Sequence, residues 1–188
     1  MPILGILASS YLATPAGSFE SISTYTLPSN QTSVTFSSIP STYLYLELRY
    51  FFRTTSGENL GVQFNSDSTS SYTGHRSMSL VGYQTGWGDN YYTPAQTFMY
   101  CGGMDPTGTV SQQGSGQVMT IFDYTNTSKY KSFSTNITFN VNGSSTGAGF
   151  ISGVWKNTSA INSIRIFCTG AQSMVTNSTF SLYGMKAS

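Results

Sequence analysis

The stretch Thr42–Phe52, TYLYLELRYFF, indicates the fold class more clearly than any other part of the chain. Large apolar side chains recur at every second position, at Leu44, Leu46, Leu48, Tyr50 and Phe52. The charged residues Glu47 and Arg49 fall between them. A strict period of two is that of a β-strand with one buried and one solvent-facing side. We therefore predict a strand here, with its leucines in a core.

Similar short runs cover the chain as far as Lys186. They lie at Thr32–Ser38, Leu60–Phe64, Ser77–Tyr83, Gln96–Tyr100, Gln117–Tyr124, Lys131–Val141, Gly149–Trp155, Ile161–Cys168 and Thr179–Lys186. Turn-forming stretches rich in Gly, Asn and Ser separate them, and no window combines a helical apolar period with helix caps. About ten short strands separated by turns predict an all-β fold, namely an antiparallel two-sheet sandwich of jelly-roll type.

The length of 188 residues fits one domain with a short extension. We predict an N-terminal arm over residues 1–18, ending in a Thr-Pro-Ala-Gly break, and a sandwich domain over residues 19–188. The predicted core includes Leu44, Leu46, Leu48, Ile164 and Leu182, with either Val118 or Met119. The two longest turn-rich stretches, 65–76 and 82–94, predict loops that are functional or mobile.

Charge is scarce along the whole chain. Eight Lys and Arg against seven Asp and Glu leave a net charge of +1, and charged residues make up 8% of the sequence. Nucleic-acid-binding proteins and polybasic membrane-surface proteins need clustered basic residues, so neither class fits. Polarity comes instead from 31 Ser and 25 Thr. A neutral surface coated with hydroxyls has little charge repulsion, which suits a protein that works inside an assembly.

Cys101 and Cys168 are too few for a disulfide scaffold, and we predict two buried free thiols rather than a bridge. The segment Met1–Ala8, MPILGILA, is apolar but has no Lys or Arg before it. Its apolar run is too short for the core of a signal peptide or for a membrane span. We interpret it as mature sequence.

Catalytic chemistry finds few candidates. His75 is the one histidine, so a Ser-His-Asp triad would need it together with Asp67 or Asp123, and no Gly-x-Ser-x-Gly elbow is present. The seven carboxylates are scattered, without a local pair for glycoside hydrolysis. Asn65, Asp67 and Ser68 could offer oxygen ligands to calcium, but a hydrogen-bonded turn explains them better. We expect no enzymatic activity, no catalytic residue, no cofactor and no metal site.

The segment 82–94 carries Trp87, Tyr91 and Tyr92 among glycines and polar residues. Planar rings beside Asp and Asn side chains are what a neutral sugar face needs. The same residue types form the hot spots of protein interfaces. A third interpretation is that the rings pack on the domain's own core. The sequence leaves a glycan contact, a protein interface and internal packing all open.

The arm contains apolar residues that have no polar alternation of their own, namely Ile3, Leu4, Ile6, Leu7 and Tyr11. Burying each of them is worth about 1.5–3 kcal/mol, which a protein in water seldom forgoes. We predict that these residues dock on a neighbouring subunit or on a shell beneath. The alternative is a first strand that packs on its own domain.

Several stretches, taken in order, resemble small virion structural proteins of tailed bacteriophages. These are Pro2–Ser10, Phe36–Tyr43 with the strand to Arg49, Phe64–Asp67 with Tyr72 and His75, Asp123–Lys131, Gly153–Ile161 and Phe180–Lys186. The resemblance spans nearly the whole chain, but the segment 82–94 departs from it. It implies a non-enzymatic component of a particle that is assembled in the host cytoplasm.

The resemblance leaves the position on the particle open, because related domains occur on heads and in tail appendages. Our first expectation is an outer capsid decoration or cement protein that docks on the major capsid protein. The alternative is a tail-fibre or adsorption module that binds host surface glycans. Because exposed aromatics on small neutral sandwiches are usually covered by further copies, we also expect a homo-oligomer, with a trimer first. No nucleic-acid or membrane partner is expected.

Overall fold

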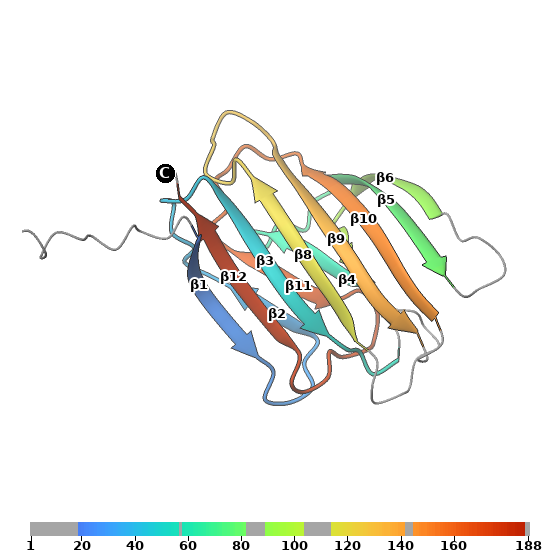
Figure 1. Cartoon of the computed structure of the whole chain (residues 1–188). Coiled ribbons are helices and arrows are strands. Elements are labelled where there is room, and N and C mark those ends of the chain that lie inside the picture. The colour runs from blue at the N-terminus through green and yellow to red at the C-terminus, as the bar shows by residue number, and fades with distance from the viewer. Residues whose placement is uncertain (1–18, 57, 82–88, 104–113, 142–144, 187–188) are drawn as a thin grey trace, which may run out of the picture.

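The computed structural model describes residues 19–56, 58–81, 89–103, 114–141 and 145–186, with side chains except at 78–81, 89–93, 140–141 and 145–146. All regular structure in these residues is β-strand (Figure 1). The twelve strands are β1 (Phe19–Thr26), β2 (Ser33–Phe36), β3 (Tyr45–Phe52), β4 (Leu60–Phe64), β5 (Tyr72–Val81), β6 (Asp89–Gln96), β7 (Met99–Gly102), β8 (Ser115–Phe122), β9 (Lys131–Val141), β10 (Ser145–Trp155), β11 (Ile164–Cys168) and β12 (Thr179–Met185). Within the described ranges, no helix is long and apolar enough to cross a membrane.

Eight of the strands form a jelly roll. In this fold the first strand pairs with the last, the second with the last but one, and so on inward, so that one long hairpin wraps into two sheets. The pairs β1–β12, β2–β11, β3–β8 and β4–β7 follow this rule, and all are antiparallel. The first sheet contains β1-β12-β3-β8 and the second contains β2-β11-β4-β7. The predicted antiparallel jelly-roll sandwich is confirmed.

Two added hairpins make the sheets unequal. The hairpin β5–β6 lies in sequence between β4 and β7, and the hairpin β9–β10 lies between β8 and β11. Both join the first sheet, which reaches eight strands in the order β1-β12-β3-β8-β9-β10-β5-β6, whereas the second sheet has four (Figure 1). The loops predicted at 65–76 and 82–94 are therefore too long, because residues 72–76 belong to β5 and residues 89–94 to β6.

The register predicted for the central strand is confirmed, with one error at its start. Leu46, Leu48, Tyr50 and Phe52 are at most 3% exposed and line the space between the sheets. Leu44 is 58% exposed, so its place in the predicted core is wrong. The reason is that β3 begins only at Tyr45, and alternation assigns sides only within a strand.

The remaining predicted core positions are also buried. Ile164 and Leu182 are fully covered, and Met119 rather than Val118 faces the core. An aromatic cluster joins the sheets where the added hairpins begin. The Phe64 ring of β4 lies 5.6 Å from Phe133 and 5.7 Å from Trp155 of the large sheet. The hairpins therefore share one core with the jelly roll.

Candidate docking surfaces

The predicted contact residues fall mostly outside the described part of the chain. Ile3, Leu4, Ile6, Leu7, Tyr11 and Trp87 lie outside the described residues. The backbone of Tyr91 and Tyr92 lies in strand β6 rather than in a loop, opposite Arg76 and His75 of β5. These positions remain predictions, and the surfaces below consist of described residues.

The outer side of the eight-stranded sheet, here called the broad face, is almost uncharged at its centre. The outward residues of its four central strands are Tyr45, Glu47, Arg49 and Phe51 of β3, Gly116, Val118, Thr120 and Phe122 of β8, Ser132, Ser134, Asn136 and Thr138 of β9, and Ala148, Phe150, Ser152 and Val154 of β10. Of these sixteen residues, Glu47 and Arg49 alone are charged. They form an ion pair of 2.6 Å, so their charges offset each other.

The guanidinium of Arg49 also lies over two aromatic rings, from β1 and β12. Its guanidinium carbon lies 4.8 Å from the centre of the Phe19 ring and 5.4 Å from that of Tyr183. These distances are typical of cation–π contacts. The broad face therefore presents hydroxyl, amide and apolar groups rather than charge.

Three phenylalanines are exposed on this neutral face. Phe51 is 58% exposed, Phe150 45% and Phe122 44%. Phe51 pairs with Gly116, and its ring lies over Gly114, just before β8, where an added Cβ would collide with it. Phe150 stands between Asn136 and Ser77 on the neighbouring strands. The broad face therefore exposes aromatic side chains of the kind that is enriched at protein interfaces.

The size of the broad face fits a protein interface. Eight strands spaced by about 4.8 Å span roughly 34 Å, and eight residues of about 3.3 Å each give a length of roughly 26 Å. The product is roughly 900 Å², close to the roughly 800 Å² that each partner buries in a standard protein complex. One partner could therefore cover this face.

The outer side of the four-stranded sheet, here called the narrow face, carries a different aromatic group. The Phe98 ring lies 5.4 Å from both Tyr100 and Phe167, at interplanar angles of 82° and 76°. All three side chains are half-buried. They lie over Gly61, where an added Cβ would come within 2.8 Å of both Phe98 and Phe167. The absence of a side chain at Gly61 lets the rings lie close to the sheet.

An arginine network borders these rings. The guanidinium carbon of Arg165 lies 4.6 Å from the Phe167 ring, and its Nη1 donates a hydrogen bond of 3.1 Å to Gln63 Oε1. Gln63 Nε2 donates in turn to the Thr97 carbonyl at 3.0 Å. The side chains of the narrow face therefore hold one another in place.

Sequence reasoning missed this cluster. The available signal was the placement of Phe98, Tyr100 and Phe167 at positions that alternate with buried residues. Bulky rings at successive outward positions indicate an aromatic surface, but only the pairing of β4 with both β7 and β11 brings them together.

Asp67 serves its own loop. Its carboxylate accepts hydrogen bonds from Thr69 N at 2.9 Å, Thr69 Oγ1 at 2.6 Å, Ser71 Oγ at 2.9 Å and Trp155 Nε1 at 2.7 Å. Burial raises the pKa of this carboxyl, but the hydrogen bonds from Thr69, Trp155 and Ser71 outweigh it and hold the pKa well below its usual range. The expected hydrogen-bonded turn is present, and this carboxylate is engaged by the protein's own donors.

The other candidates for chemistry are dispersed. His75 is exposed on β5, opposite Ser152. Cys101 and Cys168 are free and buried, as predicted, and burial raises their pKa values to about 12 and about 11, so both stay protonated at neutral pH. Over the described ranges, no three His, Cys, Asp or Glu residues form a group that could hold a metal ion.

No protein-family model and no curated protein sequence matches the chain. A solved structure of an aerolysin-like protein from Bombina maxima shares 7% sequence identity over 82% of this chain and 91% of that one, with a TM-score of 0.14. A superposition this poor bears on neither fold nor function.

Proposed function

We propose that the protein is a non-enzymatic structural component of a tailed-phage virion, an outer capsid decoration protein that docks on the shell. The observation that carries the proposal is the broad face, with Phe51, Phe122 and Phe150 exposed on a nearly uncharged sheet. Aromatic side chains surrounded by neutral polar groups are typical of protein interfaces, where charged residues are depleted at the centre.

The fold and the sequence also support a virion structural role. Jelly rolls form viral capsid domains, but they also form lectins and cupins, so the fold alone does not assign a function. Among capsid domains, lectins and cupins, the resemblance to small virion proteins favours a capsid role. The neutral, hydroxyl-rich composition suits close packing of many copies, because little charge repulsion separates them.

Counting the chain per particle tests the position on the virion. Quantitative mass spectrometry of purified particles should find hundreds of copies if the protein decorates the capsid. A few copies, or a few dozen, would place it in the tail and contradict the decoration proposal. Absence from the particles would contradict the virion role altogether.

Substitutions on the broad face test the docking surface. The double variant Phe51→Ser/Phe150→Ser should bind particles at least tenfold more weakly, because losing a hot-spot side chain costs roughly 2 kcal/mol or more. Tyr130→Ser is the matched control, since Tyr130 is 57% exposed but lies between β8 and β9, outside the broad face. Equal binding of both variants would remove the broad face as the docking surface.

A binding assay with host surface polysaccharide distinguishes the decoration protein from the alternative, an adsorption module. A glycan-binding module should bind host surface polysaccharide, and Trp87→Ala, Tyr91→Ala or Tyr92→Ala should abolish that binding. A decoration protein should bind the shell and leave the polysaccharide unbound.

A further inference from the structure

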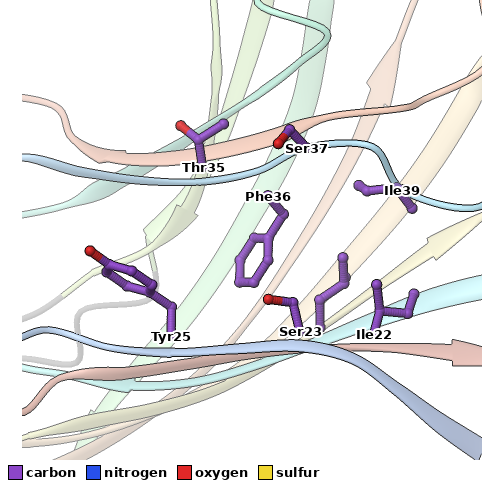
Figure 2. A pocket seen from close by; sticks show the side chains of 8 residues that line it. Ile22, Ser23, Tyr25, Thr35, Phe36, Ser37 and Ile39 are labelled. Carbon is purple, nitrogen blue, oxygen red and sulfur yellow. The ribbon is translucent and has the colours of Figure 1, made fainter.

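A half-open groove of roughly 160 Å³ lies at one edge of the sandwich, where β1 of the first sheet faces β2 of the second. Figure 2 shows Phe36 and Ile39 on one side, facing Ile22, Ser23 and Tyr25 of β1 on the other. A cavity of about 150 Å³ lined by apolar side chains holds a benzene ring. The groove therefore has room for one large apolar side chain.

The lining of the groove is apolar at its base and open at its mouth. Phe36, Ile39 and Leu182 are at most 6% exposed and form the base. Tyr25 is 40% exposed at the mouth, where its hydroxyl accepts a hydrogen bond of 3.2 Å from Gln31 Nε2. An apolar side chain inserted here would contact carbon atoms at the base.

A β-bulge shapes the groove. The pairing of β1 with β12 shifts between Ser21 and Ser23, which leaves Ile22 as an extra residue. Because of this shift, the consecutive residues Ile22 and Ser23 both line the groove instead of alternating across the sheet.

The backbone beside the groove is the most receptive sheet edge among the described strands. β1 is outermost in its sheet and has eight residues without Pro or Lys. The opposite edge strand, β6, contains Pro94, and the edge strands of the second sheet, β2 and β7, have four residues each. A long unprotected edge can accept an extended segment as a further strand, with alternate side chains entering pockets beside it.

The chain itself contains a segment of matching chemistry. Eighteen residues precede β1, and their apolar residues gather in Ile3–Leu7. An extended chain of that length reaches at most roughly 60 Å. β1 begins opposite Met185, and Lys186 fixes Glu20 by an ion pair of 2.5 Å, so the segment starts from a fixed point at the groove-bearing strand.

We propose that the groove and the free edge of β1 receive Ile3–Leu7 of a second copy of this chain. If Pro15–Gly17 formed a three-residue turn and the chain paired with its own β1, Thr14 would face Ser18, and Leu7–Ser10 would face Ile22–Tyr25. Of the apolar cluster, Leu7 alone would then reach a groove residue, and Ile3–Gly5 would pass beyond Thr26. The cluster as a whole therefore meets the groove when it comes from a neighbour. Each copy both gives a segment and receives one, so that copies join through identical contacts, as a reciprocal dimer or a ring.

Light scattering of the purified full chain tests the assignment without particles, so it does not depend on the proposed virion role. The wild type should be oligomeric at micromolar concentration. Ser23→Arg fills the groove and should reduce the mass to the 20.3 kDa of one chain. Thr24→Arg is the matched control. Thr24 is also exposed, but its side chain lies on the face of the sheet away from the groove, where it pairs with Ser181, so this variant should stay oligomeric.

Complementation identifies the segment that enters the groove. Ile6→Asp/Leu7→Asp alters both sides of an extended segment and should also give single chains. Mixed with Ser23→Arg, it should form a 1:1 dimer, because one chain keeps an intact groove and the other an intact segment. A monomeric wild type, oligomers that survive Ser23→Arg, or a mixture that stays monomeric would overturn the proposal.

Discussion

The two outer faces of the sandwich carry the same kind of side chain in opposite arrangements. On the narrow face, Phe98 contacts Tyr100 and Phe167, and all three rings are half-buried. On the broad face, Phe51 and Phe150 stand over glycine or polar neighbours and remain 58% and 45% exposed. An aromatic side chain on a sheet surface stabilises the fold where neighbouring rings pack against it. Where no ring packs against it, its surface stays exposed and can contact a partner.

The largest expected effect is a difference in stability between substitutions on the inner side and on the outer side of the eight-stranded sheet. Leu46→Ala should lower the free energy of unfolding by about 2–5 kcal/mol, because Leu46 is fully buried and its loss leaves a cavity. Tyr45→Ala, one position away on the broad face, should cost much less. Denaturant unfolding of both variants measures this, and the reverse order would place the strand in the other register.

A matched pair of glycines compares the faces directly. Gly61→Ala should destabilise the protein by about 1–3 kcal/mol, because the new Cβ comes within 2.8 Å of Phe98 and Phe167 on the narrow face. Gly116→Ala on the broad face meets Thr138 at 3.3 Å and Phe51 at 3.9 Å, so its effect should be smaller. Melting temperatures provide the measurement. Equal shifts would mean that the narrow-face rings move aside freely.

Asp67 should make the free energy of unfolding depend on pH in the acidic range. Its pKa is lowered in the folded state, so the hydrogen-bonded carboxylate contributes stability that is fully present above about pH 4 and is lost as the pH falls further. Asp67→Asn should cost about 1–3 kcal/mol at pH 7, and the difference from wild type should shrink toward pH 3. Glu47→Gln, which breaks a surface ion pair on the broad face, is the control and should change stability by less than about 1 kcal/mol. Thermal unfolding across this pH range would contradict us if the difference stayed constant.

The smallest expected change in stability belongs to the broad face itself. Phe51→Ser should alter the free energy of unfolding by no more than about 0.5 kcal/mol, because exposed surface residues contribute little to folding. Phe98→Ser on the narrow face should cost at least about 1 kcal/mol, since it removes two ring contacts. A large loss from Phe51→Ser would make that ring part of the fold rather than of a docking surface.

Local pattern was sufficient for the fold class and the central register. Strict alternation from Leu46 to Phe52 assigned each residue to its side, because a strand repeats every two residues whatever its partners are. The burial of both thiols also followed from residue type alone. The error at Leu44 marks the limit of this reasoning, since alternation does not say where a strand begins.

What only the tertiary structure decided depends on pairing between distant residues. The narrow-face cluster forms because β4 pairs with both β7 and β11, so residues 98 and 167 meet over Gly61. Likewise, β6 becomes a strand because β5 offers it an edge, and Ile22 and Ser23 share one side because β12 fixes a bulge in β1. A sequence window records the period of its own side chains, whereas the partners that supply hydrogen bonds and neighbouring side chains to these sites lie outside it.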